Sequence, residues 1–165
     1  MTHYVRLRDV AEADLSIFFD QQVDPIAVHM AAFTARDPAD WDAFNAHWVK
    51  IRRDPAVMLR TILADGRVAG YVGSFEERPS KPEVTYWIAK ELWGQGVATE
   101  ALSQFLRVEK RRPIYARAAR DNVASLRVLE KCGFSITGYE KGYANARGVE
   151  IEEANLQLDP AERME

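Results

Sequence analysis

Cysteine is nearly absent from this chain of 165 residues, which contains one, Cys132. A single cysteine cannot form an internal disulfide, and it excludes a metal site built from several thiolates. Cys132 falls on an apolar helical stripe, so we expect it to pack in the core rather than react. The histidines His29 and His47 have no second ligand one helical turn away, and we therefore predict no metal site.

Long apolar runs are missing as well. No segment approaches the roughly 20 residues of a membrane-spanning helix, and residues 1–8 lack the apolar stretch of a signal peptide. These absences predict a soluble, cytoplasmic protein with no membrane partner. Positive charge is in short supply, because 22 Lys and Arg stand against 25 Asp and Glu, a net charge of −3. This balance argues against a nucleic-acid partner, which requires a basic surface.

What remains is an ordinary globular composition, 47% hydrophobic and 28% charged, without repeats or low-complexity blocks. The length predicts a single domain over residues 1–165. Apolar alternation predicts strands over residues 3–8, 56–64, 68–75, 83–89, 113–118, 134–143 and 149–158. Helical spacing predicts helices over residues 11–22, 37–51, 97–111 and 122–132, with a helical turn and a loop between 23 and 36. This order predicts an α/β fold with one mixed sheet flanked by helices.

Two of these helices carry recognisable start signals. Asp37-Pro38 predicts a helix start, because Asp caps an N-terminus and Pro fits the first helical position. Asn122 is predicted to cap the helix over residues 122–132, and Gly133 to end it.

A strand, a glycine turn and a helix start follow one another between Tyr86 and Ala101, around Gly94-Gln95-Gly96. The first amides of a helix have no internal partner and lie at the positive end of its dipole, so this turn is a candidate phosphate cradle. A plain tight turn is the alternative, held at about even odds on this segment alone. The third glycine of a Rossmann fingerprint is replaced by Thr99, and the Gly-Lys-Ser/Thr of a P-loop is absent.

The segment Trp93-Gly94-Gln95-Gly96-Val97-Ala98 resembles the acetyl-CoA pyrophosphate loop of the GNAT N-acetyltransferase superfamily. Its pattern is Gln/Arg-x-x-Gly-x-Gly/Ala. A second stretch, from Asn122 to Phe134, is similar to the N-x-x-S…E-K-x-G-F segment of the ribosomal-protein-alanine acetyltransferase branch. Two departures are visible. Trp93 stands where the superfamily usually has Gln or Arg, as is frequent in that branch. Leu129 replaces the tyrosine that many members use as general acid.

The resemblance implies a GNAT-type acyltransferase fold, in which two adjacent parallel strands splay apart and admit acetyl-CoA. It implies that the amides of Gly94, Gln95, Gly96, Val97, Ala98 and Thr99 hold the pyrophosphate. It further implies that the strand of Trp87, Ile88 and Ala89 pairs with the pantetheine arm. Asn122 would bind pantetheine or a water, and Ser125 would lie near the thiol and stabilise or protonate it. Dimers are common in the superfamily, so a homodimer is compatible with the resemblance.

Glu83 begins the strand that leads into this turn. In several superfamily members a Glu here acts as a general base through water, and the alternative is a solvated carboxylate at a strand start. Alkyl amines have a pKa near 10.4 and α-amines near 8, so a base matters more for alkyl amines. Direct attack of the amine on the thioester requires no protein nucleophile.

The acceptor cannot be identified from the residues. By the family's architecture, residues 21–36 and the closing hairpin 139–150 frame it, the latter carrying Glu140, Tyr143, Arg147 and Glu150. The basic run at residues 110–112 is a solvated helix end or a contact for the 3′-phosphate of CoA. The resemblance implies direct acetyl transfer from acetyl-CoA to a primary amine of a peptide N-terminus or small molecule. A non-catalytic acyl-CoA-binding or sensing module is the alternative, with a nucleotide-binding domain third.

Overall fold

The computed structural model describes residues 2–161, in which seven strands form one sheet in the order β1-β2-β3-β4-β5-β7-β6. The strands are β1 (Val5–Arg8), β2 (Met58–Ala64), β3 (Arg67–Arg78), β4 (Lys81–Ile88), β5 (Ile114–Ala119), β6 (Ser135–Ala144) and β7 (Val149–Leu158). β4 and β5 run parallel, whereas the other neighbouring strands run antiparallel. The predicted α/β fold with one mixed sheet is confirmed, and the ends of the predicted domain, residues 1 and 162–165, lie outside the described residues.

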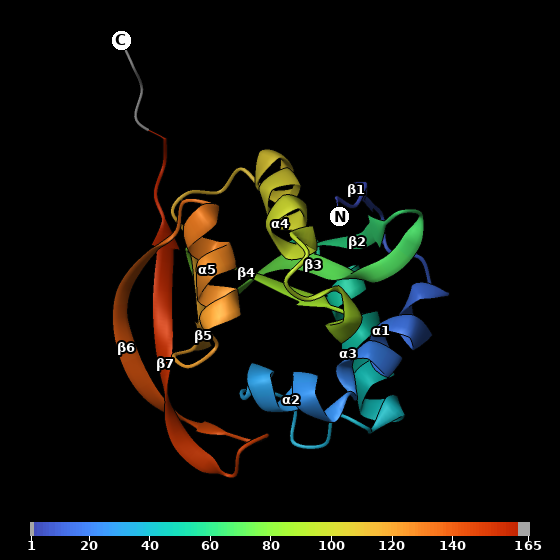
Figure 1. Cartoon of the computed structure of the whole chain (residues 1–165), viewed down its shortest axis with the longest axis horizontal. Helices are drawn as coiled ribbons and strands as arrows, with labels where there is room; N and C mark the ends of the chain where they lie inside the picture. The colour runs from blue at the N-terminus through green and yellow to red at the C-terminus, as the bar shows by residue number, and fades with distance from the viewer. Residues whose placement is uncertain (1, 162–165) are drawn as a thin grey trace.

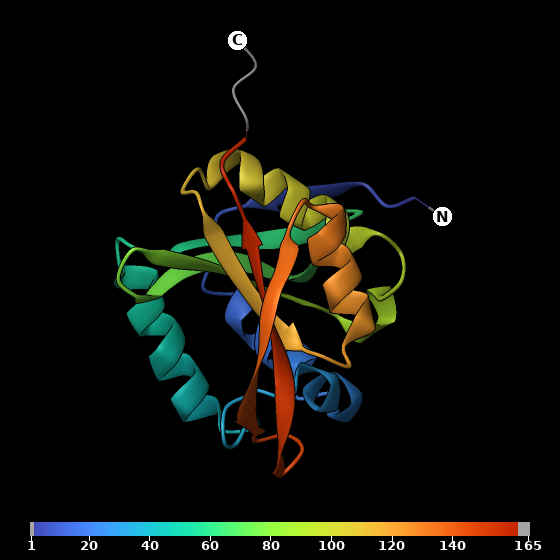
Figure 2. The same cartoon turned by 90° about the vertical axis from the view of Figure 1, so that its left-hand side faces the viewer.

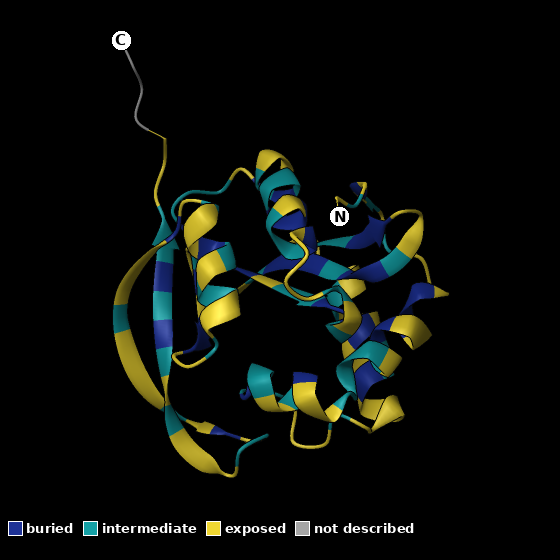
Figure 3. Cartoon of the chain, viewed as in Figure 1, coloured by how far each residue is buried: buried dark blue, intermediate teal, exposed yellow. Residues whose placement is uncertain are grey.

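Helices cover both faces of this sheet (Figure 1). They are α1 (Asp14–Gln22), α2 (Pro25–Ala31), α3 (Trp41–Arg53), the short 3₁₀ turn η1 (Lys90–Leu92), α4 (Val97–Val108) and α5 (Val123–Lys131). α4 and α5 pack with Val72, Val84 and Ile88 in the largest core cluster. α1 and α3 pack on the opposite face, where Tyr71 and Leu59 meet Phe18 and Trp48. Figure 3 shows the buried residues on the strands and on the inward sides of the helices.

The sheet has two parts that cross steeply. Figure 2 shows β5, β6 and β7 running across the direction of β2, β3 and β4. β5, β7 and β6 pair with one another over four or more positions in each ladder, as β1 to β4 do, with register shifts in some ladders. Between the two parts, β4 and β5 share one paired position, Glu83 opposite Tyr115. The two strands therefore diverge beyond Glu83, toward the glycine turn.

Several boundaries differ from the prediction, and α1, α4 and β2 are two or three residues shorter than expected. A helix, α2, fills part of the segment expected to be a turn and loop, because Asp24 caps it by accepting bonds from the amides of Ile26 and Ala27 and Pro25 is its first residue. The Asp37-Pro38 pair does not begin a helix. α3 begins at Trp41, where Asp40 accepts a bond from the amide of Ala43.

The second hairpin is tighter than expected. β3 continues to Arg78 and β4 begins at Lys81, so the predicted strands over residues 68–75 and 83–89 extend toward each other and leave a short turn at Pro79-Ser80. In the first hairpin, Asp65 and Gly66 connect β2 to β3, with positive φ at both residues as a type I′ turn requires.

Candidate active site

A cavity of about 1490 Å³ passes through the sheet where β4 and β5 diverge. Its lining comes from both faces. On the face of α4 and α5 it includes Gly94, Gly96, Val97, Ala98, Thr99, Tyr86, Asn122, Ser125, Arg127 and Lys131. On the face of α1 and α3 it includes Tyr71, Glu77, Glu83, Thr85, Trp87, Arg117 and Glu153. A ligand entering along α4 can therefore reach the opposite face of the sheet without leaving the cavity.

The glycine turn opens this cavity at the N-terminus of α4. Gly94 and Gly96 adopt positive φ values of 74° and 82°, and a Cβ at either position would meet nothing within 4 Å. Gly96 is the N-cap, no side chain caps α4, and the first helical bond runs from the Glu100 amide to the Gly96 carbonyl. The amides of Val97, Ala98 and Thr99 thus have no partner within the helix. These features, with the positive end of the α4 dipole, make a site for an anion.

The turn is anchored by the side chains of Trp93 and Gln95. The Trp93 indole N–H donates to the Ile88 carbonyl at 2.9 Å. Gln95 donates to the Glu91 carbonyl at 2.8 Å, and its Oε1 lies 2.5 Å from Nε2 of His3. The side chain of Gln95 is thus engaged elsewhere, and the predicted contact of Gln95 with a ligand falls to its backbone amide.

Two cationic side chains, Arg127 and Lys131, line the same end of the cavity from α5. α5 lies beside α4, as Figure 1 shows, and Cys132 Sγ approaches the Thr99 carbonyl at 3.6 Å. Burial raises the pKa of the Cys132 thiol, and its contacts are those of a packing residue, as expected. The anion site therefore combines free amides with two nearby positive charges.

The backbone of β4 alternates between β3 and the gap. The Ala89 amide donates to the Ala69 carbonyl, so by alternation the polar backbone groups of Trp87 also face β3, whereas those of Tyr86 and Ile88 face the gap. The Ile88 carbonyl is taken by Trp93. Of the residues predicted to pair with the pantetheine arm, Ile88 therefore directs its backbone N–H and C=O groups into the gap. Tyr86, two residues earlier in β4, does the same.

Trp87 contributes its side chain instead. Its indole Nε1 is buried and has no hydrogen-bond partner among the described residues, and Trp87 lines the cavity. A buried donor without a partner costs roughly 1–3 kcal/mol. A ligand in the cavity with an acceptor at this point would remove that cost, which is an observation in favour of a bound polar molecule.

The N-terminus of α5 forms the wall opposite β4. Asn122 caps the helix, as predicted, by accepting a bond from the Ser125 amide at 3.3 Å, and its Nδ2 donates to the Met30 carbonyl at 3.4 Å. Ser125 Oγ lies 2.7 Å from the hydroxyl of Tyr86. Leu129 is 2% exposed and lies in the core. A role for Asn122 toward pantetheine stays a prediction, because the observed contacts of its side chain are structural.

Charged side chains gather at the other end of the cavity. Glu83 is 4% exposed, so the alternative of a solvated carboxylate is wrong. Arg117 Nε donates to Glu83 at 3.2 Å, and Arg78 approaches it at 3.6 Å. Arg117 also pairs with Glu77 at 3.0 Å and Glu153 at 3.8 Å.

These charges do not cancel. The ion pairs join three carboxylates, those of Glu77, Glu83 and Glu153, to the two guanidinium groups of Arg78 and Arg117. Burial raises the pKa of the Glu153 carboxyl, and the nearby Glu83 carboxylate adds to the rise while Arg117 opposes it. This end of the cavity is acidic and suited to a cation.

The segment 21–36 lines the cavity through Gln22, Ala27, Met30, Phe33 and neighbouring residues, as predicted for the acceptor side. The closing hairpin does not: Glu140, Tyr143, Arg147 and Glu150 are absent from the lining, and that prediction is wrong. Arg147 instead pairs with Asp121 and donates to the His29 carbonyl at 2.9 Å. The hairpin thereby fixes α2 and the β5–α5 connection.

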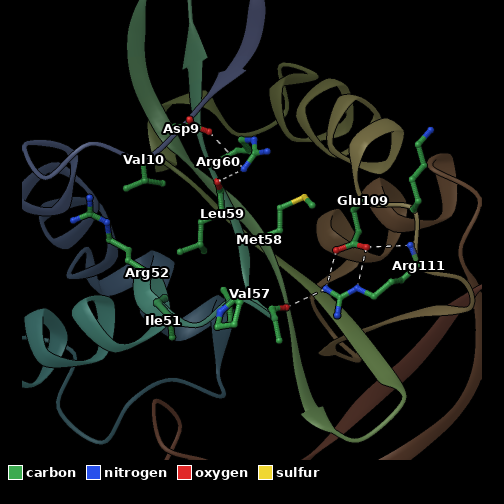
Figure 4. A pocket seen from close by; sticks show the side chains of 13 residues that line it. Asp9, Val10, Ile51, Arg52, Val57, Met58, Leu59, Arg60, Glu109 and Arg111 are labelled. Atoms are coloured by element: carbon green, nitrogen blue, oxygen red, sulfur yellow. Dashed lines mark hydrogen bonds and ion pairs between the residues drawn. The ribbon is translucent and has the colours of Figure 1, made fainter.

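The basic run at residues 110–112 has a structural role. Arg112 donates to the carbonyls of Leu106 and Glu109 at the end of α4. Arg111 binds both carboxylate oxygens of Glu109, which also accepts from Ser74, beside a smaller pocket of about 730 Å³ between α3 and β2 (Figure 4). Burial alone would raise the pKa of Glu109, but the bonds from Arg111 and Ser74 outweigh it and set it to about 2. This pocket is separate from the glycine turn.

Sequence reasoning missed Tyr86, Arg117 and Glu153. Alternation along β4 places Tyr86 and Glu83 on opposite faces of the sheet, but nothing in the sequence indicates that Ser125 lies against Tyr86. Arg117 is flanked by alanines in a buried strand, and that isolated charge was the available signal. Within residues 2–161, no group of three His, Cys, Asp or Glu side chains is arranged to hold a metal ion. None of the described helices has the length and apolar character needed to cross a membrane.

Residues 5–135 match the family model of the acetyltransferase (GNAT) domain. No curated protein matches the sequence. The fold is similar to a spermidine N-acetyltransferase from Vibrio cholerae solved with CoA and spermine, at 19% identity and TM-score 0.80, covering 94% of this chain and 95% of that one. It is also similar to a ribosomal-protein-alanine N-acetyltransferase from Brucella melitensis, at 21% identity and TM-score 0.79, with coverage of 94% and 99%. A putative acetyltransferase from Salmonella typhimurium with acetyl-CoA has 20% identity, TM-score 0.79 and coverage of 98% and 97%.

Proposed function

The chain belongs to the GNAT acetyltransferase family, and from that premise we propose that it transfers the acetyl group of acetyl-CoA directly to a primary amine. Both substrates occupy the cavity together, acetyl-CoA from the α4 side and the amine from the face of α1 and α3. The observation that carries the proposal is that one cavity joins an open helix N-terminus to an acidic pocket through the gap between β4 and β5.

At the α4 end, the amides of residues 94–99 donate hydrogen bonds to the diphosphate. The open space above Gly94 and Gly96 lets the diphosphate approach the backbone closely. Arg127 and Lys131 add positive charge. The pantetheine arm then runs along β4 toward Tyr86 and Ser125, and the acyl group ends near the gap. Structures of similar fold that were solved with CoA or acetyl-CoA support a donor of this type.

At the acidic end, the carboxylates of Glu83, Glu77 and Glu153 favour an amine acceptor that carries positive charge. An amine must lose a proton before it attacks, and Glu83 takes that proton directly or through a water. The amine nitrogen then bonds the acetyl carbon, the carbon–sulfur bond breaks, and CoA leaves as the thiol. A peptide N-terminus and a small-molecule amine both meet this requirement.

The test measures acetyl-CoA binding by calorimetry and CoA thiol release with a panel of alkyl amines and peptides. Gly96→Glu places a side chain and a negative charge in the diphosphate seat, so it should weaken acetyl-CoA binding at least about tenfold (~1.4 kcal/mol). Gly148→Glu is the matched control, because Gly148 also has positive φ, 68°, in the turn between β6 and β7 and lies outside the cavity.

The experiment also decides against the non-catalytic alternative. Micromolar binding with thiol release that depends on an added amine supports the enzyme. Binding without turnover on every acceptor supports an acyl-CoA-binding module. A folded protein with no acetyl-CoA binding, or with equal loss in both glycine variants, contradicts the proposal.

A further inference from the structure

Tyr86 and Ser125 form a pair of hydroxyl groups in the wall of the cavity, between its two ends. Tyr86 lies on β4, with its side chain on the face opposite Glu83, Thr85 and Trp87. Its hydroxyl is 2.7 Å from Ser125 Oγ and 3.4 Å from the Ser125 carbonyl, and both residues line the cavity.

The pair is held in place from both sides. β4 is paired with β3 along its length, which fixes Tyr86. Ser125 lies in the first turn of α5, where its amide is bound by the Asn122 cap and Asn122 in turn binds the Met30 carbonyl. One turn further along α5, the buried Leu129 has no proton to donate. In contrast to Leu129, the hydroxyl groups of Tyr86 and Ser125 on this wall are uncharged and carry protons that they can donate.

The pair also has a proton to spare. Two hydroxyls carry two protons, and one hydrogen bond between them uses one. The other proton can be donated into the cavity, because the alternative acceptor, the Ser125 carbonyl, is at a long 3.4 Å. Burial raises the pKa of Tyr86 to about 12, so both hydroxyls keep their protons at the pH of any assay.

Position along the gap decides what this proton meets. The glycine turn lies after the end of β4, Glu83 lies near its beginning, and Tyr86 stands between them. A thioester arm that starts at the α4 amides therefore passes Tyr86 and Ser125 before its acyl group reaches Glu83. This step rests on the proposed function.

We propose that Tyr86, paired with Ser125, completes a hydroxyl pair that donates a hydrogen bond to the sulfur of CoA and stabilises the thiolate that leaves when acetyl is transferred. The amine nitrogen forms its bond to the acetyl carbon, and the carbon–sulfur bond breaks with its electron pair on sulfur. The proton lost by the amine ends on sulfur through solvent, and both hydroxyls retain their own. The role left vacant at Leu129 is thus filled from a different element, β4.

Binding of CoA and of desulfo-CoA, measured by calorimetry between pH 7 and 9.5, tests this directly. A free alkyl thiol has a pKa near 8.5, and a hydrogen bond to the thiolate lowers it. Wild type should bind CoA about tenfold more tightly than desulfo-CoA at the upper pH, from the strength of hydrogen bonds to charged groups. Tyr86→Phe and Ser125→Ala should abolish most of this difference, while leaving desulfo-CoA binding within about twofold.

Turnover gives the second readout. Tyr86→Phe should lower kcat about tenfold or more with little change in KM for acetyl-CoA, since the bond forms as the thiolate develops. Ser125→Thr keeps the hydroxyl and should retain most activity that Ser125→Ala loses. Tyr115→Phe is the control, because Tyr115 lies on the neighbouring strand β5 outside the cavity lining.

The two possible failures are distinguishable. If wild type binds neither CoA nor desulfo-CoA, the proposed function is wrong and this role is wrong with it. If both ligands bind equally at every pH, or the variants keep the wild-type difference and kcat, the hydroxyl pair has no role in thiolate stabilisation and the proposed function stands.

Discussion

Glu83 is a residue whose surroundings, rather than its type, decide its chemistry. It sits at the last paired position of β4 and β5, is buried, and is held by Arg117 and Arg78. The sequence indicated a carboxylate near the start of a strand, and alternation predicted the face on which it lies. It could not indicate burial or the two arginines, because Arg78 comes from β3 and Arg117 from a strand that follows an intervening helix.

Replacing Glu83 by Gln tests the proposed base. Removing a proton at pH 7 from an alkyl amine costs about 3 kcal/mol more than from an α-amine, given pKa values near 10.4 and 8. Glu83→Gln should therefore lower kcat/KM for alkyl amines by about tenfold or more, and for peptide α-amines much less, in a steady-state assay of thiol release.

Glu77→Gln is the matched control for this variant. Glu77 pairs with the same Arg117 guanidinium but its side chain is 64% exposed. It should change both classes of amine alike and by little. Equal losses on alkyl amines and α-amines in Glu83→Gln would reject the base role.

At the scale of the element, cap residues explain both a correct and a wrong prediction. Asn122 caps α5 as predicted. The Asp-Pro pair at residues 37–38 was predicted to begin a helix, but the pair that does so is Asp24-Pro25, at the start of α2. Both pairs have the same local chemistry. The difference lies in tertiary packing, because Ala27 of α2 is buried and Ala32, just after it, packs with Ala119 and Ala144. Such contacts are not visible in a local pattern.

Asp14 joins three elements, and its titration predicts a pH dependence of stability. It pairs with Arg8 of β1 at 2.6 Å, begins α1, and accepts a bond from Thr61 of β2 at 2.7 Å. The bond from Arg8 lowers the pKa of Asp14 from 3.8 to about 2. Because the native pKa lies below the unfolded value, the ionised carboxylate stabilises the fold above about pH 4. That contribution, about 2 kcal/mol, is lost as the pH falls toward 2.

Urea unfolding between pH 7 and 2 measures this contribution. Asp14→Asn should be less stable than wild type at pH 7, and its stability should fall less steeply between pH 4 and 2. Asp20→Asn, on the exposed side of α1, should follow the wild-type profile. A parallel decline of wild type and Asp14→Asn through this range would contradict the assignment.

The whole molecule separates charge across its sheet. Arg127 and Lys131 lie at the α4 end of the cavity, and Glu77, Glu83 and Glu153 lie around Arg117 at the other. Composition predicted a small net charge of −3 and could not reveal this polarity. The strand order and the divergence of β4 from β5 were available only through family resemblance. Periodicity assigns residues to strands but does not specify how strands pair across 30 residues of sequence.

This polarity predicts an acceptor preference that depends on salt. An alkyl diamine places a second positive charge among the carboxylates, whereas a monoamine does not. Raising ionic strength from 50 to 500 mM shortens the Debye length to a few ångströms, so KM for the diamine should rise about twofold to fivefold, from ~0.5–1 kcal/mol per screened pair. KM for the monoamine should change less. An equal rise for both would show that the acidic end does not select the acceptor.

A crystal structure of the protein with CoA tests the proposed binding mode most directly. We expect the diphosphate against the amides of residues 94–99 at the start of α4, and the pantetheine arm in the gap between β4 and β5. We also expect the sulfur beside Tyr86 and Ser125, facing Glu83. CoA bound outside this cavity, or a diphosphate held away from those amides in a folded protein, would contradict this binding mode.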